Sequence, residues 1–184
     1  MARKTITELY AQATADFADN TSGAITPIKL RQFCQDFLDT VRPSYAAIVL
    51  TTGIPVSVST TDTVFSWSSI VAAQAPDWTV SLGSGNISRA NGPASTQINF
   101  SIDCVAPNNS ITIFTLYVDG VATPWVISNT STSASDIQSF AFSAVSYSAN
   151  LTPTYQIRAK SNGTNTVTLS NGVLVCQNIP VNVN

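Results

Sequence analysis

The chain has 184 residues, of which 44% are hydrophobic and only 10% are charged, and its formal net charge is −2. This length suits one domain of ordinary size with an appendage, and the apolar fraction excludes a chain that is disordered by composition. There is no run of basic residues and no apolar stretch near the roughly 18 residues of a membrane helix. We therefore expect neither nucleic acid nor a membrane as a partner.

The scarcity of charge carries information about the surface. Soluble domains usually contain roughly 25% charged residues, whereas here Ser, Thr and Asn supply most of the polar groups. Neutral hydrogen-bonding side chains suit β structure and turns. The composition therefore predicts a surface that is largely covered by partner chains.

Charge is also unevenly distributed along the chain. Ten of the eighteen charged residues lie within residues 1–42, and the other eight are spread over the remaining 142. This change in composition predicts a boundary near residues 42–44. We expect a helical N-terminal arm over residues 1–43 and a second domain over residues 44–184.

Two short amphipathic helices are predicted before the boundary. The first begins after Thr5, which forms a capping box with Glu8, and the second begins at Pro27 after the N-cap residue Thr26. Apolar residues recur at helical spacing in both, namely Ile6, Leu9, Tyr10, Ala13 and Phe17 in the first, and Leu30, Phe33, Phe37, Leu38 and Val41 in the second. Isolated helices of this length are marginal in water, so they are expected to pack on each other, on the following domain or on another molecule.

The three cysteines, Cys34, Cys104 and Cys176, are widely spaced and form no CxxC pair. They are predicted to be buried free thiols. The segment MARKTITELYAQ lacks the apolar core of a secretory signal. Together these features favour synthesis in the cytosol.

After the boundary the hydrophobic period changes from that of a helix to two. In residues 96–106 the apolar side chains alternate with polar ones, as Ile98, Phe100, Ile102 and Cys104 show. The same spacing joins Phe65 to Trp67, Phe140 to Phe142, and Tyr155 to Ile157. Turn signals separate the runs at Asn91-Gly92, Asp119-Gly120, Asn162-Gly163 and Asn171-Gly172. Short strands divided in this way predict a β-sandwich or barrel.

Residues 110–120, SITIFTLYVDG, depart from this one-sided pattern. Ile111 and Ile113 lie on one face of the predicted strand, whereas Phe114, Leu116 and Val118 lie on the other. A strand that is apolar on both faces is buried on both, either within the fold or against another subunit. Phe114 and Leu116 are therefore candidates for contact with a partner chain.

Side chains that commonly perform catalysis are scarce. The chain contains no histidine, and its one glutamate, Glu8, is assigned to the helix cap. The aspartates of the second part are scattered singly, at positions 62, 77, 103, 119 and 136, and Asp119 is expected to be the first turn residue of a hairpin. No nucleophile elbow, phosphate loop or metal-ligand spacing occurs. The sequence predicts no enzyme, no cofactor and no metal; a glycan-active enzyme would need two of these aspartates to converge.

The three tryptophans, Trp67, Trp78 and Trp125, are open to two interpretations. Indole rings stack on sugars and anchor protein contacts, but they also fill cores and subunit interfaces. We favour packing for the set. Trp125, which follows Pro124 just after a predicted hairpin turn, is the one least expected to be buried, and it joins the candidates for partner contact.

Two stretches resemble known families. The segment ITELYAQATADFADNTSGAITPIKLRQFCQDFLDTV resembles the N-terminal helical segment of many tailed-bacteriophage virion proteins, in which an N-x-x-G-x-I-T-P-x-x-L-R stretch leads into a helix and then a β head. The likeness is carried by Asn20, Gly23, Ile25, Thr26, Pro27, Leu30 and Arg31. The stretches INFSIDCVAPNNSITIFTLYVDGVA and SFAFSAVSYSANLTPTYQIRAKSNGTNTVTLSNGVLVCQNIP are similar to jelly-roll heads related to tumour necrosis factor (TNF) and C1q, with VTLSNGVLV as a closing hairpin. Residues 44–90 are not placed by either resemblance.

These resemblances imply a mainly β protein, a jelly-roll sandwich head preceded by a two-helix arm, that forms a homotrimer in the virion. The absence of a repeat-rich stalk favours a compact capsid decoration (cement) protein, made in the host cytoplasm, whose partners are the major capsid protein or other virion proteins. The expected anchor residues in the arm are Ile6, Leu9, Phe17, Leu30, Phe33 and Phe37. The alternative is a tail-associated fibre or receptor-binding protein whose β head binds a host surface glycan.

Overall fold

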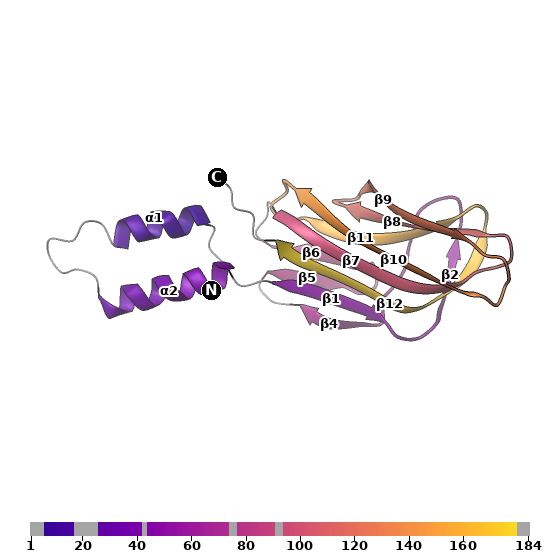
Figure 1. Cartoon of the computed structure of the whole chain (residues 1–184), viewed down its shortest axis with the longest axis horizontal. Helices are drawn as coiled ribbons and strands as arrows, with labels where there is room; N and C mark the ends of the chain where they lie inside the picture. The colour runs from indigo at the N-terminus through magenta and orange to yellow at the C-terminus, as the bar shows by residue number, and fades with distance from the viewer. Residues whose placement is uncertain (1–5, 17–25, 42–43, 74–76, 91–93, 180–184) are drawn as a thin grey trace. The chain divides into compact units, whose positions relative to one another are not determined.

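The computed structural model describes residues 6–16, 26–41, 44–73, 77–90 and 94–179 (Figure 1). The chain divides into two compact units. One contains the helices α1 and α2 and is called the arm below. The other, Ser44–Ile179, contains the strands β1 to β12 and is called the head.

The arm consists of α1 (Ile6–Asp16) and α2 (Pro27–Val41), which pack against each other. The start of α2 confirms the predicted cap: the Lys29 amide donates to Thr26 Oγ1 at 3.3 Å, and the Leu30 amide donates to the Thr26 carbonyl at 3.1 Å. Pro27 occupies the first helical position, where a missing amide costs nothing. Thr5 and Phe17 lie outside the described residues.

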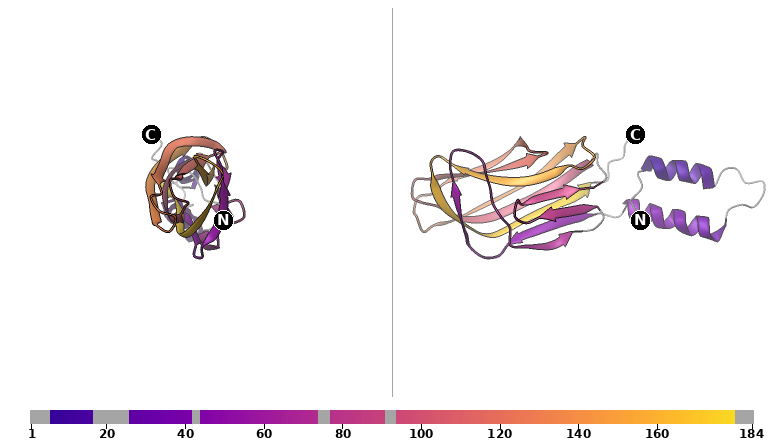
Figure 2. Two further views of the ribbon diagram at one scale, coloured as in Figure 1. Left: turned by 90° about the vertical axis from the view of Figure 1, so that its right-hand side faces the viewer. Right: turned by 180° about the vertical axis from the view of Figure 1, so that it is seen from behind.

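The head is built from two antiparallel sheets, which are layered against each other (Figures 1 and 2). Sheet A has the strand order β10-β7-β12-β1-β4, and β2 pairs with another part of β12. Its strands are β1 (Tyr45–Leu50), β2 (Ile54–Val58), β4 (Ser69–Ala73), β7 (Ala94–Val105), β10 (Ile137–Ser148) and β12 (Asn165–Ile179).

Sheet B has the strand order β5-β6-β11-β8-β9, and the short β3 pairs with β11. Its strands are β3 (Thr63–Val64), β5 (Trp78–Ser81), β6 (Asn86–Arg89), β8 (Ile111–Val118), β9 (Val121–Thr130) and β11 (Thr154–Ser161). Strands that are consecutive in sequence often lie in different sheets, as in a jelly roll. The predicted mainly β jelly-roll sandwich is confirmed, and residues 44–90, which the sequence left unplaced, supply β1 to β6.

A cluster of aromatic rings joins the two sheets. Phe114 of β8 lies with its ring centroid 5.5 Å from that of Phe100 and 4.9 Å from that of Phe140, which belong to sheet A. The rings are tilted or edge-on to each other, the arrangement that the aromatic quadrupole favours. The alternating residues Ile98, Phe100, Ile102 and Cys104 are all at most 3% exposed. The predicted inward face of β7 is thus confirmed.

The Asp119-Gly120 turn is confirmed as the hairpin between β8 and β9. Both residues have positive φ, 53° and 77°, as a type I′ turn requires. The Asp119 carboxylate accepts hydrogen bonds from the Thr154 amide at 2.8 Å and from Ser148 Oγ at 2.6 Å. This side chain therefore ties the turn to the connection between β10 and β11.

The hairpin predicted at Asn171-Gly172 is wrong. These residues lie inside β12, where the pairing with β7 shifts register between Ser170 and Val173, and Asn171 has a φ of 48°. The feature is a β-bulge, which re-aims the strand without ending it. A Cβ on Gly172 would lie 3.0 Å from the Cβ of Leu50, so close packing also favours glycine there. Asn162-Gly163 joins β11 to β12, and Asn91-Gly92 lies outside the described residues.

The prediction that the cysteines are buried holds for the two in the head but not for the one in the arm. Cys104 and Cys176 are buried free thiols, as predicted, and burial raises the pKa of Cys104 to about 11 and raises the pKa of Cys176 as well. Cys34 is exposed, because it lies on a side of α2 that α1 does not cover. The prediction of burial is corrected for this residue.

Candidate functional site

The outer face of sheet A is almost free of charge. Asp103 is the one charged residue in the strands of this sheet. In the central cross-strand rows, small and uncharged side chains lie side by side across four strands. The rows are Ser143, Asn99, Val175 and Ala47, and Ala141, Ser101, Val173 and Val49. We call the outward residues of β1, β7, β10 and β12 the sheet A face.

The single charge on this face is held by neutral donors. Ser139 Oγ donates to Asp103 Oδ1 at 2.6 Å, and Asn171 Nδ2 donates to Asp103 Oδ2 at 2.9 Å. These two hydrogen bonds favour the ionised carboxylate and hold the pKa of Asp103 below its usual value. The one charge on this face is therefore satisfied by the face's own hydrogen bonds.

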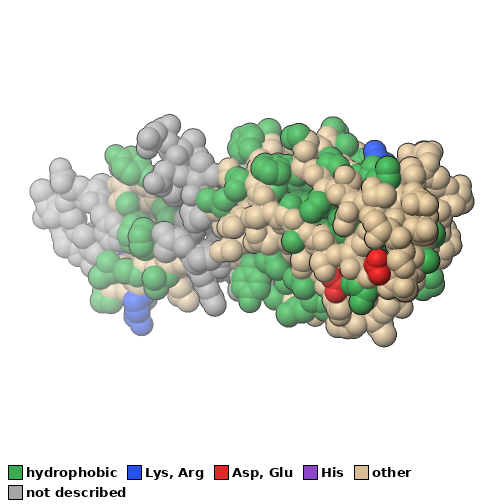
Figure 3. Space-filling view, turned by 45° about the vertical axis from the view of Figure 1, so that its right-hand side comes forward, with side chains coloured by type: hydrophobic (Ala, Val, Ile, Leu, Met, Phe, Trp, Pro, Cys, Tyr) green, Lys and Arg blue, Asp and Glu red, His purple; other side chains and the backbone are tan. Residues whose placement is uncertain are grey.

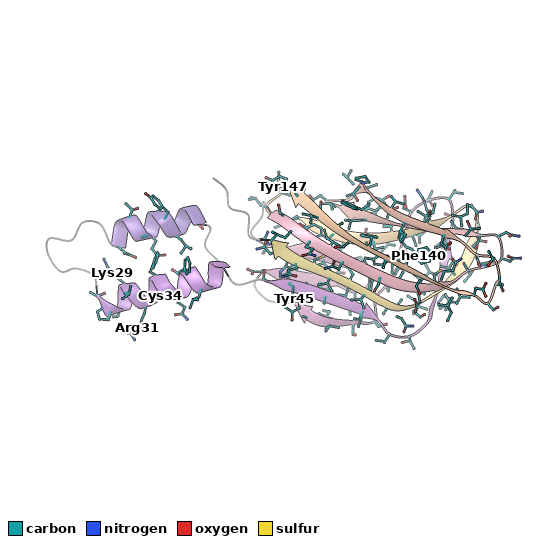
Figure 4. All side chains as sticks on the ribbon, in the orientation of Figure 1. Lys29, Arg31, Cys34, Tyr45, Phe140 and Tyr147 are labelled. Carbon is teal, nitrogen blue, oxygen red and sulfur yellow. The ribbon has the colours of Figure 1, made fainter. Side chains whose placement is uncertain are left out.

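Large apolar side chains lie in the central rows and beside them. On β10 Val145 and Tyr147 are 56% and 65% exposed, and Val173 of β12 is 37% exposed. Tyr45 of β1 and Tyr147 lie toward the same end of the head (Figure 4). In the space-filling view, hydrophobic and uncharged polar surface covers most of the visible side of the head, with few charged side chains (Figure 3). Such a surface is typical of a protein interface.

A second apolar surface runs along β9, the edge strand of sheet B. Val121, Trp125 and Val126 are 69%, 41% and 52% exposed, and we call these three residues the edge strip. Strand β9 contacts β10, the edge strand of sheet A, so the strip continues toward the sheet A face. The expectation that Trp125 is the least buried tryptophan is confirmed, since Trp67 and Trp78 are 4% and 2% exposed in the core.

Sheet B has a different outer face, which carries a polar cluster. The Tyr117 hydroxyl donates to Asp62 Oδ2 at 2.8 Å, Lys160 Nζ lies 3.7 Å from the same oxygen, and the Arg158 guanidinium lies 3.9 Å from the Tyr117 ring centroid. The hydrogen bond to Asp62 raises the pKa of Tyr117, because ionisation would remove the donated proton. This cluster covers the outward side of β8, the strand predicted to be buried on both faces.

Two of the three predicted partner contacts are corrected by the structure. Phe114 and Leu116 are both 0% exposed, because they point between the sheets into the head's own core. Their apolar character reflects packing within one chain, so they are not available to a partner. Trp125 remains accessible.

The predicted anchor residues have different environments in the arm. Leu9 is 6% exposed, Phe33 is half-buried, and Leu30 and Phe37 are 50% and 48% exposed. Ile6 is the first residue of α1, but its side chain, like the whole of Phe17, lies outside the described residues. Leu9 therefore stabilises the helix pair, whereas Leu30 and Phe37 face outward.

The sheet A face was missed by sequence reasoning, although a signal for it was present. The alternating pattern of β7 assigned Gln97, Asn99 and Ser101 to the outward side, and these residues carry no charge. What the pattern could not show is that equally uncharged residues of β1, β10 and β12 lie beside them. Strand order and register create the face.

The described residues contain no group of three or more His, Cys, Asp or Glu side chains that could hold a metal ion. No helix in the part of the chain that the structure describes is long and apolar enough to cross a membrane.

No protein-family model and no curated protein matches the chain. Solved structures do match. Eiger TNF from S. frugiperda superposes with a TM-score of 0.56 at 14% identity, covering 75% of this chain and 94% of that one. Murine APRIL at pH 8.0 gives a TM-score of 0.54 at 10% identity, covering 75% of this chain and all (100%) of that one.

The globular domain of the zebrafish complement 1qA protein gives a TM-score of 0.50 at 8% identity, covering 76% of this chain and 98% of that one. At identities this low the likeness concerns the fold alone. The head therefore has the TNF- and C1q-like jelly-roll fold, as the sequence resemblance implied.

Proposed function

We propose that the chain is a homotrimeric, non-enzymatic structural protein of a bacteriophage virion, of the kind that decorates and stabilises a capsid. The observation that carries the proposal is the sheet A face, a broad surface with Asp103 as its one charge. A solvent-facing surface normally carries interspersed charges. Depletion of charge at the centre of a surface is the compositional mark of an interface core.

The trimer uses two different surfaces of each chain. The sheet A face of one copy receives the edge strip of the next, so that Trp125 packs on uncharged residues such as Val173 and Ser101. Contacts between unlike patches are heterologous and close into a ring when the rotation allows it. The TNF and C1q resemblance implies a ring of three.

The arm supports the placement in a virion. Its second helix begins at the Thr26-Pro27 cap of the stretch that resembles phage virion proteins. The arm also exposes large apolar side chains, among them Tyr10, Ile28 and Leu38 at 76%, 72% and 63%. A pair of short helices with this much exposed apolar surface needs a further partner. Anchored by the arm, a trimer would bridge neighbouring capsomers and resist the internal pressure of the packaged genome.

Trimer formation is tested by placing a charge at the centre of the sheet A face. Val173→Arg is expected to convert the trimer, with three times the 19.4 kDa mass of one chain, into a monomer, because an unpaired buried charge costs about 3–5 kcal/mol. Light scattering coupled to gel filtration measures the mass. The matched control is Thr79→Arg on the exposed outer side of β5, which should remain trimeric. A trimeric Val173→Arg protein, or a monomeric unmodified chain, would overturn the assembly.

The virion placement is tested by counting copies in purified particles with quantitative mass spectrometry. Hundreds of copies per particle are expected of a decoration protein, whereas a few dozen or fewer would indicate a tail component. Deletion of residues 1–43 is expected to leave the trimer intact and to abolish binding to shells that lack the protein. Undiminished binding by the truncated chain would rule out anchoring by the arm.

The exposure of Trp125 is the single observation that favours a second function. In a tail-associated receptor-binding protein, this indole would stack on a host surface glycan. Trp125→Ala separates the two functions. Loss of glycan binding by a variant that stays trimeric supports the receptor-binding function, whereas loss of the trimer supports the contact between copies.

A further inference from the structure

Helix α2 carries an apolar seam with the spacing of a coiled coil. Leu30, Cys34, Phe37 and Val41 are separated by four, three and four residues, which is the alternation of a and d positions in a heptad. Leu30, Cys34 and Phe37 are all exposed in the arm. The side chain of Val41 lies outside the described residues, but its position continues the spacing.

The side of α2 that faces α1 is largely polar, although the half-buried Phe33 lies next to its polar residues. Asp36 is 5% exposed and accepts a hydrogen bond from Gln32 Nε2 at 2.8 Å, and Lys29 Nζ lies 3.7 Å from Asp16 Oδ1 of α1. On a helical wheel these three α2 residues lie on a different side from the seam. The contact within the arm thus leaves the more apolar surface of α2 uncovered, which is the reverse of the usual arrangement.

Chain connectivity links the seam to the sheet A face. Only residues 42 and 43 separate Val41, the last residue of α2, from Ser44, which precedes β1. A fully extended chain advances at most about 3.6 Å per residue, so the steps from Val41 to Ser44 span at most roughly 11 Å. Strand β1 contributes Tyr45, Ala47 and Val49 to the sheet A face. Where three such faces assemble around an axis, three α2 helices are tethered close to each other.

We propose that the α2 seams of three copies pack on one another as a parallel helical bundle, joined to the ring of heads. The occupant of the exposed seam is therefore a second and third copy of this chain. Heptad spacing favours a helix of the same kind as partner, and the short connection supplies a high local concentration of that partner. The proposal rests on the trimer of the proposed function and extends it into the arm.

This assignment changes which part of the arm is available to a capsid. Leu30 and Phe37 are predicted anchor residues, but a seam that is covered by copies of the chain cannot also bind the shell. The shell contact then falls to the side of the arm that carries exposed Tyr10 of α1. Deletion of the arm abolishes shell binding whether the seam is covered by copies of the chain or by the shell. It therefore does not distinguish between these two occupants.

The seam is tested through its own cysteine in the unmodified full-length chain. Cys34 is exposed, whereas Cys104 and Cys176 are buried in the head with raised pKa values, which makes their thiols unreactive. A short bis-maleimide joins two nearby thiols without the strict geometry of a disulfide. In a bundle, Cys34 is expected to link two of the three chains, seen as a dimer band on a denaturing gel.

The matched control moves the thiol by one residue to the outside of the predicted bundle. Cys34→Ser combined with Gln35→Cys places it at an exposed position that does not belong to the seam. Cys34 should cross-link on the order of a hundredfold faster than this control, because the bundle holds the seam thiols of the tethered copies next to each other, whereas thiols at position 35 point away from the neighbouring helices. The rate for Cys34 should not change on dilution.

Three outcomes separate this inference from the proposed function. Fast, concentration-independent cross-linking in a trimer supports the bundle. A trimer in which Cys34 reacts no faster than the control, or at a rate proportional to concentration, overturns the bundle and leaves the trimer of heads in place. A monomeric chain with no cross-link overturns both.

Discussion

The two outer faces of the head differ in how their polar groups are used. On the outer face of sheet B, Arg158 and Lys160 take part in the cluster with Tyr117 and Asp62. Sheet A carries only Asp103. Both sheets cover the same aromatic core, so burial of the core does not explain the difference.

Charge is therefore kept away from one of the two sheets that cover this common core. A charged cluster on sheet B is compatible with water on its outer side, because charged groups that stay near solvent lose little hydration energy. A face built from Val, Ala, Ser and Asn loses less hydration energy on burial than a charged face does. This contrast is the physical reason for assigning assembly to the sheet A face.

The largest expected effect comes from removing the core that both faces share. Phe114→Ala should lower the free energy of unfolding by about 3–5 kcal/mol, since a buried ring leaves a cavity between the sheets. Urea denaturation measures the change, in the Val173→Arg background so that unfolding is not coupled to association.

The control for this change is Leu151→Ala, at a side chain that is 74% exposed. Its expected effect is within about 0.5 kcal/mol. If the two variants were equally stable, Phe114 would not be the packing centre of the head. The two outer faces could then not be described as covering one shared core.

A smaller effect is expected from Tyr117→Phe on sheet B. The change removes the hydrogen bond to Asp62, whose Oδ1 is already buried without a hydrogen-bond partner. Loss of a hydrogen bond to a charged group should cost about 1.5–3 kcal/mol, measured by urea denaturation. The mass in solution should stay that of a trimer. Dissociation of this variant would show that sheet B also takes part in assembly.

The smallest effect concerns Asp103 and depends on pH. Its pKa is lowered by hydrogen bonds from Ser139 and Asn171, so its ionised form stabilises the folded state above the ordinary aspartate pKa of 3.8. This stability is lost as the pH falls through the lowered pKa. Ser139→Ala should therefore reduce the thermal midpoint slightly at pH 7, and the deficit should shrink as the pH falls below about 4.

Ser143→Ala is the matched control for the pH dependence. Ser143 Oγ donates across the same pair of strands to the neutral Asn99 Oδ1 at 2.8 Å. Its deficit should not vary with pH over this range. Equal pH dependence in the two variants would show that Asp103 is not the titrating group.

Local patterns in the sequence were sufficient for most of the secondary structure. The Thr26-Pro27 cap, the alternation in β7 and the turn at Asp119-Gly120 are contained in a few adjacent residues, and each is confirmed. The Asn171-Gly172 signal failed, because the same residues suit a hairpin turn and a bulge. Only the neighbouring strand β7, which pairs with β12 on both sides of the bulge, decides between them.

The hydrophobic period and the composition, which depend on adjacent residues, were enough to predict a β-sandwich or barrel with little charge, preceded by two short helices. The tertiary structure decided which surfaces are left for partners. It buried Phe114 and Leu116 between the sheets, and it brought outward residues from four distant strands together into the sheet A face. An alternating strand specifies two sides, but only packing against the second sheet determines which of them stays exposed.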